Sequence, residues 1–251
     1  MKKFSLIGNP ISHSKSPALF RAAYKECEFS YNLIEEPTIE ESMNKFEAGG
    51  YFGANITSPF KESIMSYIQY PDIISSKIGA ANTIIKGPNG LQSYNTDYYG
   101  VTEIIKEIGE KRINTALVIG GGGAGKAAAL ALKDSGINVT IANRTLQKIA
   151  LFAEKVRIKA ISLDSMEEYI KESEMIIYAL SMPIEQLNQK RLKRKIILEA
   201  NYATPNYRPE KEKSQEITYI CGKKWLLYQA VKAFELFTGS SPNILAMRKI
   251  V

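Results

Sequence analysis

The stretch from residue 115 to residue 143 constrains the fold of this chain most strongly. Its first apolar run, Ala116 to Ile119, has the length and composition of a buried parallel strand. A glycine-rich loop follows at once, and the Ala/Leu-rich segment Ala127 to Lys133 then predicts a helix that ends near Gly136. A second apolar run begins at Val139. The stretch therefore predicts a strand–helix–strand unit of an α/β sheet.

The glycine loop between the first strand and the helix has the spacing G-x-G-x-x-G. The first glycine permits a tight turn, the second lets the backbone approach a pyrophosphate, and the third lets the helix pack closely on the strand. Unfilled N–H groups and the positive end of the helix dipole also favour an anion there. A flexible turn without a ligand is the alternative, but the surrounding strand, helix and strand favour dinucleotide binding. The predicted binding residues of the loop are Gly120, Gly122, Gly123, Ala124, Gly125 and Lys126.

The end of the second strand indicates which dinucleotide is bound. NAD sites usually place an acidic residue there, where it holds the ribose 2′-hydroxyl. This strand instead ends in Asn143, Arg144 and Thr145, with no acid. Arg144 can face a 2′-phosphate, to which Asn143 and Thr145 can hydrogen-bond, and Lys126 adds charge nearby. An ordinary solvated arginine is the alternative, but the missing acid favours NADP as the cofactor.

The charge balance bears on the partners of the chain. Its 251 residues, 45% hydrophobic and 24% charged, suffice for one large domain or two small ones. A formal net charge of +7 fits nucleic acid or anionic small molecules equally well. The basic residues are scattered, however, with the densest clusters at Lys190 to Lys195 and at Lys223-Lys224. Because no nucleic-acid motif accompanies them, we expect a small-molecule substrate and no nucleic acid.

Cysteine and histidine usage restricts the chemistry and the compartment. Cys27 and Cys221 lie far apart without metal-ligand spacing, which is typical of a reduced cytosolic protein. His13 is the only histidine, so we expect neither a metal site nor Ser-His-Asp catalysis. The apolar run after Lys2-Lys3 is too short for a signal-peptide core, and no run has transmembrane length. We therefore expect a cytoplasmic protein with no membrane partner. The sequence does not distinguish a monomer from a homodimer.

Two serines near the amino terminus follow a predicted strand, Phe4 to Ile7. Ser16 precedes Pro17, and this order predicts a helix from Pro17 to Lys25 with Ser16 as its N-cap. Ser14 and Ser16 would then lie where hydroxyls and helix N–H groups converge, which is a natural site for a carboxylate. A plain helix cap is the alternative interpretation.

A lysine and an aspartate are candidates for proton transfer. Pro59 predicts another helix start, and Lys61 in its first turn would be unfavourable for the helix dipole. A lysine at this unfavourable position indicates a functional role for Lys61. An ordinary surface lysine is the alternative interpretation. Thr96 can cap a helix running to Ile108, and Asp97 suits its first turn. Helix-start electrostatics alone would therefore also explain Asp97.

The last third of the chain continues the α/β pattern. The loop Asn201 to Pro205 follows a short apolar strand, at the carboxyl end where such sheets bind ligands. The segment Trp225 to Phe237 predicts a helix with one apolar stripe. Gln229 is a polar residue within this segment, so it is either an edge residue or a ligand contact.

Together these motifs resemble the shikimate dehydrogenase family. They follow the family's order over nearly the whole chain: Ser12 to Pro17, Gly53 to Lys61, Gly79 to Thr83, Asn95 to Asp97, the glycine loop, Asn143 to Thr145 and Gln229-Ala230. The resemblance implies a two-domain α/β fold with a cleft between the domains. The substrate domain would comprise residues 1–97, completed by 222–251, and the Rossmann-like NADP-binding domain would comprise 98–221.

The resemblance also implies an activity and roles for individual residues. The activity would be the reversible, NADP-dependent reduction of 3-dehydroshikimate to shikimate, in aromatic amino acid biosynthesis. Lys61 and Asp97 would form the catalytic pair. The other implied contacts are the substrate carboxylate for Ser14 and Ser16, the ring hydroxyls for Thr57, Asn82 and Gln229, the substrate and nicotinamide for Tyr202, and the cofactor for Gly222.

Three departures from the family pattern keep alternatives open. Tyr178 to Pro183 replaces a stretch that often reads Asn-x-Thr-x-x-Gly, Glu199 stands where aspartate is commoner, and Lys224 replaces a glycine near the nicotinamide. One alternative is a relative that acts on quinate or another hydroxylated cyclic acid, since one ring substituent can reverse the preference. Another, motivated by Lys224 and by the departure at Leu180 to Pro183, is an NADP-binding protein with little turnover.

Overall fold

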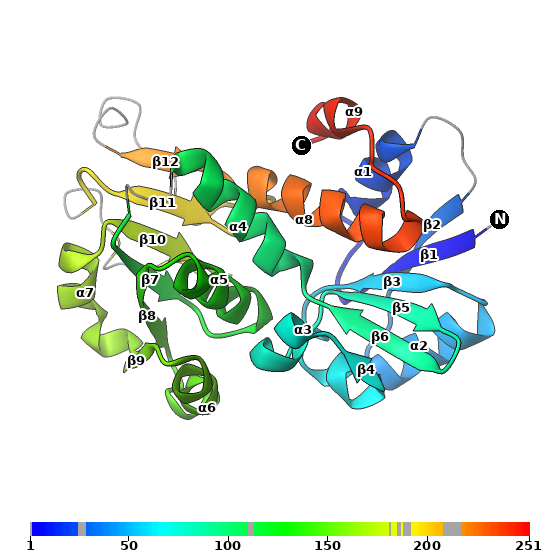
Figure 1. Cartoon of the computed structure of the whole chain (residues 1–251), viewed down its shortest axis with the longest axis horizontal. Helices are drawn as coiled ribbons and strands as arrows, with labels where there is room; N and C mark the ends of the chain where they lie inside the picture. The colour runs from blue at the N-terminus through cyan, green and yellow to red at the C-terminus, as the bar shows by residue number, and fades with distance from the viewer. Residues whose placement is uncertain are drawn as a thin grey trace. The chain divides into compact units, whose positions relative to one another are not determined.

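The structure is a computed structural model that describes residues 2–24, 29–109, 113–180, 182–184, 187, 192–207 and 217–251. The chain divides into two compact units (Figure 1). The first unit comprises Met1–Gly100 and Leu227–Val251, and the second comprises Val101–Leu226. Cys27 and part of the basic cluster Lys190 to Lys195 lie outside the described residues.

A mixed six-stranded sheet forms the centre of the first unit. Its strands in spatial order are β2 (Phe29–Ile34), β1 (Lys2–Ile7), β3 (Gly53–Ile56), β5 (Thr83–Gly87), β6 (Gly90–Tyr94) and β4 (Tyr70–Pro71). Strand β1 pairs in parallel with both β2 and β3, so the carboxyl ends of these three strands share one edge. Strand β5 pairs antiparallel with both β3 and β6, so β5 and β6 form a hairpin.

Helices cover this sheet and complete its core. They are α1 (Ser16–Ala23), α2 (Ile39–Ala48), α3 (Ile73–Ile78), the 3₁₀ helix η1 (Ser63–Tyr67), the start of α4 (Thr96–Ile108), most of α8 (Gly222–Thr238), and α9 (Ile244–Arg248). The α8 aromatics join the N-terminal elements: the rings of Phe237 and Phe4 stack at 4.5 Å, and Phe20 packs near both Phe234 and Phe237. Residues far apart in the sequence thus build one core.

A parallel six-stranded sheet forms the second unit. Its strands in spatial order are β9 (Lys159–Ser162), β8 (Asn138–Asn143), β7 (Thr115–Ile119), β10 (Met175–Tyr178), β11 (Ile196–Glu199) and β12 (Thr218–Ile220). Every pairing between neighbours is parallel. Numbered within this unit, the order is 3-2-1-4-5-6, the order of a Rossmann fold, with the switch point between β7 and β10. The predicted Rossmann-like arrangement is therefore confirmed.

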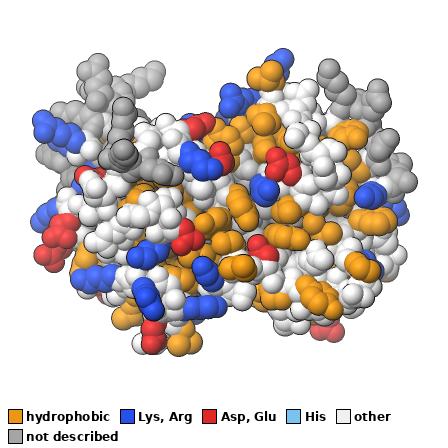
Figure 2. All heavy atoms as spheres, viewed as in Figure 1, with side chains coloured by type: hydrophobic (Ala, Val, Ile, Leu, Met, Phe, Trp, Pro, Cys, Tyr) orange, Lys and Arg blue, Asp and Glu red, His pale blue; other side chains and the backbone are white. Residues whose placement is uncertain are grey.

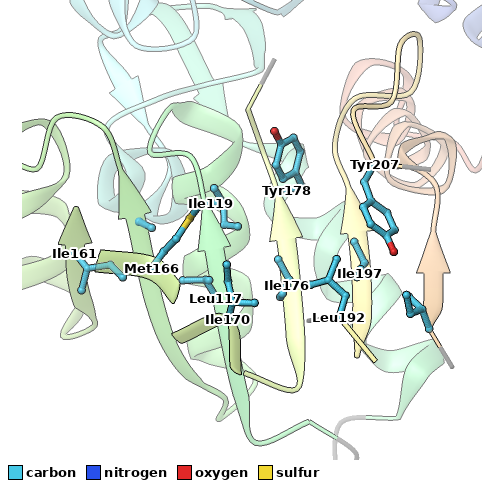
Figure 3. Packing of buried hydrophobic residues seen from close by; sticks show 12 residues of the cluster. Leu117, Ile119, Ile161, Met166, Ile170, Ile176, Tyr178, Leu192, Ile197 and Tyr207 are labelled. Carbon is cyan, nitrogen blue, oxygen red and sulfur yellow. The ribbon is translucent and has the colours of Figure 1, made fainter. Parts of the chain in front are cut away.

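The core of the second unit explains the apolar strands of the sequence. Leu117, Ile176 and Ile197 lie on neighbouring strands, and each is at most 2% exposed (Figure 3). Within its described residues, this unit also contains the helical segments α5 (Gly123–Asp134), α6 (Gln147–Val156), η3 (Leu163–Ser165) and α7 (Met166–Glu172). None of the helices in the described ranges combines the length and the hydropathy that spanning a bilayer would require.

Candidate functional site

Lys61 and Asp97 meet in the first unit although 36 residues separate them. Lys61 Nζ donates to Asp97 Oδ2 at 2.6 Å, and the two side chains are 19% and 9% exposed. A hydrogen bond between an ammonium and a carboxylate is strengthened by their charges, and partial burial weakens the competition from water. The carboxylate therefore fixes the position of the ammonium, which is the hydrogen-bond donor of the pair.

The local structure around Lys61 differs from the sequence-based prediction. We expected a helix beginning at Pro59, but Lys61 lies in a turn and the 3₁₀ helix η1 begins only at Ser63. The carbonyl of Lys61 accepts a hydrogen bond from the N–H of Ala81 at 2.8 Å. This long-range bond uses the carbonyl that a helix would have paired within the same segment. It also ties the turn to the segment directly before β5, which contains Asn82.

Asn82 and Gln229, two predicted substrate contacts, lie together beside Thr96. Asn82 Oδ1 accepts from the main-chain N–H of Thr96 at 2.6 Å, and Asn82 Nδ2 donates to Gln229 Oε1 at 3.4 Å. The Thr96 hydroxyl lies 3.1 Å from Asn82 Oδ1 and 3.2 Å from Gln229 Oε1. Asn82 and Thr96 are 3% and 0% exposed, so this is a buried polar network.

Thr96 has a different position from the predicted one. It is the first residue of α4 rather than the residue before it, and Asn82 supplies the oxygen that binds its N–H. The reason is that a side chain from a distant segment satisfies this helix start, so a local cap is unnecessary. Thr96 was not predicted as a site residue from the sequence. Its position directly before the candidate catalytic residue Asp97 could have indicated it. Asp97 lies in the first turn of α4, as expected.

The two serines lie at the start of α1, but Ser16 is not its N-cap. The helix begins at Ser16 itself, and Lys15 before it makes no side-chain cap bond. Instead the Ser16 N–H donates to Ser14 Oγ at 3.2 Å. Ser14 therefore makes the side-chain contact that we expected of Ser16. No acidic residue lies in the first turn of α1, so the positive end of its dipole is not neutralised there.

Thr57 lies at the same sheet edge as the segment after β1. It directly follows β3, and its N–H donates to the carbonyl of Ile7, the last residue of β1, at 2.8 Å. Because β1 and β3 are parallel, the segments that follow them leave the sheet at the same edge. Thr57 is half-buried. The first unit thus holds Thr57 at the strand ends, where ligands bind in open α/β sheets.

The glycine loop in the second unit is shaped for an anion. Helix α5 begins at Gly123, with Gly122 as its N-cap, no side-chain cap and no acid in its first turn. A Cβ on Gly125 would lie 1.8 Å from the carbonyl oxygen of Gly120, whereas a Cβ on Gly122 would have no heavy atom of the described residues within 4 Å. Packing within the protein therefore requires glycine at position 125 but not at position 122. Gly122 leaves room outside the helix start, so these residues fit the pyrophosphate of a dinucleotide.

The turn after β8 is tied to this loop. Asn143 Oδ1 accepts from the N–H of Gly121 at 3.1 Å, and its Nδ2 donates to the Thr145 carbonyl at 2.9 Å. Asn143 thereby holds the turn that carries the exposed Arg144. Lys126, in the first part of α5, is only 9% exposed. Further exposed basic side chains gather over α6 and β9 (Figure 2), namely Lys148, Lys155, Arg157 and Lys159.

A buried carboxyl organises the loop after β11. Glu199 is 0% exposed, and its Oε2 accepts from the Tyr207 N–H at 3.1 Å. Burial raises the pKa of Glu199, against backbone N–H donors of this loop that lower it. Burial, with the nearby charge of Glu199, also raises the pKa of Tyr178 to about 12. The partly buried Tyr202 lies in the loop that Glu199 holds, and Gly222 is the first residue of α8.

Lys224 has a protein partner. It forms an ion pair with Glu107 of α4, and the two side chains are 41% and 39% exposed. A charge at this position is therefore compensated within the second unit. Elsewhere, the described part of the chain contains no group of three His, Cys, Asp or Glu side chains that could hold a metal ion.

Comparison with known proteins agrees with this geometry. Three family models match: the shikimate dehydrogenase substrate binding domain over residues 6–84, shikimate / quinate 5-dehydrogenase over 103–203, and the shikimate 5'-dehydrogenase C-terminal domain over 226–251. Shikimate dehydrogenase (NADP(+)) of Natronomonas pharaonis is 35% identical over 99% of this chain and 98% of that protein. The protein of that name from Pyrococcus abyssi is 31% identical over 100% and 97%.

A solved structure is similar over the whole chain. Shikimate 5-dehydrogenase from Thermus thermophilus, in complex with NADP(H) and shikimate, superposes with a TM-score of 0.87 at 28% identity, covering 100% of this chain and 98% of that one. The resemblance inferred from the motifs is thereby confirmed. This chain belongs to the shikimate dehydrogenase family.

Proposed function

We propose that this chain catalyses the reversible, NADP-dependent reduction of 3-dehydroshikimate to shikimate. The observation that carries the proposal is the 2.6 Å contact between Lys61 and Asp97, next to the polar network of Asn82, Thr96 and Gln229. Relatives named shikimate dehydrogenase (NADP(+)) and the Thermus thermophilus complex with NADP(H) and shikimate support it. Substrate binding is assigned to residues 1–97 with 222–251, and NADP binding to 98–221.

The proposed chemistry needs one proton donor from the protein. NADPH, when bound, supplies the hydride to the ring carbonyl carbon. The Lys61 ammonium polarises the carbonyl and gives a proton to the oxygen as its negative charge develops. Asp97 holds the ammonium in place through the contact described above. In the oxidation direction Lys61 accepts the proton from the hydroxyl, so one side chain serves both directions.

Binding contacts orient the substrate for this step. Ser14, Ser16 and the start of α1 are assigned to the ring carboxylate, since hydroxyls and helix N–H groups favour an anion. Asn82, Gln229 and Thr57 are assigned to the ring oxygens, and Tyr202 to the substrate near the nicotinamide. Fixing the ring in this way places the carbonyl for hydride and proton transfer and lowers the entropic part of the barrier.

Cofactor binding is assigned to the glycine loop and the turn after β8. The start of α5 and Gly122 receive the pyrophosphate, and Arg144 with Thr145 receives the 2′-phosphate. Asn143 contributes by holding this turn against the loop. The alternative of an NADP-binding protein with little turnover was based partly on Lys224, which replaces a glycine near the nicotinamide. The ion pair of Lys224 with Glu107 compensates this added charge and so argues against that alternative.

The proposal also includes the cellular compartment, the oligomeric state and the partners. We place the enzyme in the cytoplasm, as a monomer or a homodimer whose partners are the small-molecule substrate and NADP. Cys221 is a free thiol, which accords with a reducing compartment.

A spectrophotometric assay tests the function directly. Purified protein with shikimate and NADP⁺ is expected to generate NADPH absorbance, and parallel assays with quinate and with NAD⁺ measure substrate and cofactor preference as ratios of kcat/KM. Absence of turnover with shikimate would overturn the proposal, and turnover with quinate alone would reassign the substrate.

The serines at the start of α1 give the first prediction. Replacing Ser14 and Ser16 together by alanine is expected to raise the KM for shikimate about tenfold or more, because two hydroxyl contacts to a carboxylate are lost. The dissociation constant of NADP should change less than about twofold, as the cofactor is assigned to the other unit. Steady-state kinetics and a cofactor fluorescence titration check both. A matching loss of NADP affinity would show that the change acts through the fold.

The turn after β8 gives the second prediction. Arg144→Ala is expected to erase most of the preference for NADPH over NADH. The loss of a charge-assisted contact to the 2′-phosphate costs about 2 kcal/mol, which is roughly thirtyfold in affinity. Lys155→Ala, an exposed basic residue at the far end of α6, is the matched control. The assignment of Arg144 fails if the NADPH/NADH ratio of kcat/KM is the same in the Arg144 variant and in the wild type.

A further inference from the structure

We propose that Thr96 is a positioning residue whose hydroxyl fixes the side-chain amide of Gln229, so that its nitrogen, a hydrogen-bond donor, is turned to the substrate. The inference rests on the proposed function and deepens it. It specifies that Gln229 donates to the substrate rather than accepts from it, and that Thr96 determines this orientation.

The orientation of the Asn82 amide follows from a main-chain group. The N–H of Thr96 can only donate, and it lies 2.6 Å from one end of the Asn82 amide, so that end must be the oxygen. The nitrogen of Asn82 then faces Gln229 at 3.4 Å. Because this nitrogen can only donate, the atom of Gln229 that faces it must be Oε1. One backbone N–H thus sets the orientation of two side chains in sequence.

The proton of the Thr96 hydroxyl has two acceptors within reach, and the network selects one. Thr83 Oγ1 accepts from Asn55 Nδ2 at 3.0 Å and lies 3.3 Å from Asn82 Oδ1, to which it donates. Together with the Thr96 N–H, this bond fills both lone pairs of Asn82 Oδ1. The Thr96 hydroxyl therefore donates to Gln229 Oε1, 3.2 Å away.

Burial makes this arrangement rigid. Asn55, Thr83, Asn82 and Thr96 are each at most 6% exposed, so no bulk water competes for their hydrogen bonds. The Asn55 end is itself fixed, because Asn55 Oδ1 accepts from the Tyr31 hydroxyl at 2.8 Å. A directed chain of bonds therefore runs from the core to Gln229. With Oε1 held by Thr96 and Asn82, the amide nitrogen lies on the opposite side of the Gln229 amide, and there we assign it to a ring oxygen of the substrate.

A substitution at Thr96 tests the role of the hydroxyl. Thr96→Val keeps the branched shape and the main-chain N–H but removes the hydroxyl, so the Gln229 amide can turn. The KM for shikimate is expected to rise about tenfold, while the NADP dissociation constant changes less than about twofold. Thr96→Ser restores a hydroxyl and is expected to return the KM to within about threefold of wild type. A Thr96→Val enzyme with wild-type KM would overturn the inference.

A double-mutant cycle separates positioning from a general structural role. If Thr96 acts through Gln229, Thr96→Val should raise KM less than about twofold in a Gln229→Ala background. An undiminished effect in that background would overturn the inference, since the hydroxyl would then act by another route.

A third variant tests whether Gln229 acts as a hydrogen-bond donor, even if Thr96→Val does not fold. Gln229→Glu keeps an oxygen towards Thr96 and Asn82 but replaces the donor by a second oxygen. It is expected to raise the KM for shikimate about as much as Gln229→Ala does, and a wild-type KM would show that no donor is needed there. Failure of the proposed function is distinguishable, because the wild-type protein itself would then show no NADP-linked oxidation of shikimate.

Discussion

Replacing Lys61 by methionine is expected to lower kcat for shikimate oxidation by roughly 10²- to 10⁴-fold, the range for lost acid–base assistance. Methionine has a similar length and no ionisable group, so the change removes the group that exchanges the proton with the substrate while largely preserving the space that the side chain fills. In the structure Lys61 Nζ lies 2.6 Å from Asp97 Oδ2, and the Lys61 side chain is 19% exposed. The only histidine of the sequence is His13, and its side chain is exposed.

Controls distinguish lost chemistry from lost structure. Lys86 forms an exposed ion pair with Glu47 in the same unit, so Lys86→Met removes a comparable charge and is expected to leave kcat within about twofold. The NADPH dissociation constant of the Lys61 variant, measured by fluorescence, should stay near the wild-type value. A Lys61→Met enzyme with wild-type kcat would contradict the mechanism.

The partner of Lys61 is tested by coupling. Asp97→Asn should also lower kcat, because the amide no longer holds the ammonium by charge. If the two residues act as a unit, the double variant loses less than the product of the two single losses. Multiplicative losses would mean that the contact between Nζ and Oδ2 has no part in catalysis.

The second unit was the more predictable part of the fold because its signals are local. The apolar run Ala116 to Ile119, the glycine loop and the next strand lie within 30 consecutive residues, and each has a period or a spacing that only a few structures satisfy. The short edge strands β9 and β12 were not predicted. They have 4 and 3 residues, and such short runs carry little periodicity of their own.

The candidate site was less predictable because long-range contacts determine its local structure. Pro59 favours a helix start by itself, but the hydrogen bond from Ala81 to the Lys61 carbonyl holds that segment as a turn. The sequence also predicted Ser16 and Thr96 as helix N-caps. In the structure Ser14 Oγ and Asn82 Oδ1 instead accept hydrogen bonds from the N–H groups of Ser16 and Thr96. Local propensity located the two helix starts correctly. The hydrogen bonds of the folded chain determine which side-chain oxygen accepts from the N–H groups at each start.

Two glycines of the same loop are expected to respond oppositely to the same added methyl group. In Gly125→Ala the new Cβ would lie 1.8 Å from the carbonyl oxygen of Gly120, and a backbone atom cannot move aside without displacing β7 or α5. The free energy of unfolding should fall by about 1–3 kcal/mol or more, the cost of overpacking. Thermal or urea unfolding without cofactor measures this effect.

Gly122→Ala should leave the fold intact and weaken cofactor binding instead. The residue has φ −76°, which alanine adopts, and its Cβ would have no neighbour within 4 Å among the described residues. Its unfolding free energy should therefore stay within about 0.5 kcal/mol of wild type. The methyl would occupy the space assigned to the pyrophosphate, so the NADPH dissociation constant should rise about tenfold or more. Unchanged NADPH affinity in this stable variant would mean that the pyrophosphate does not approach the backbone at Gly122, and the phosphate site would then have to lie elsewhere along the α5 start.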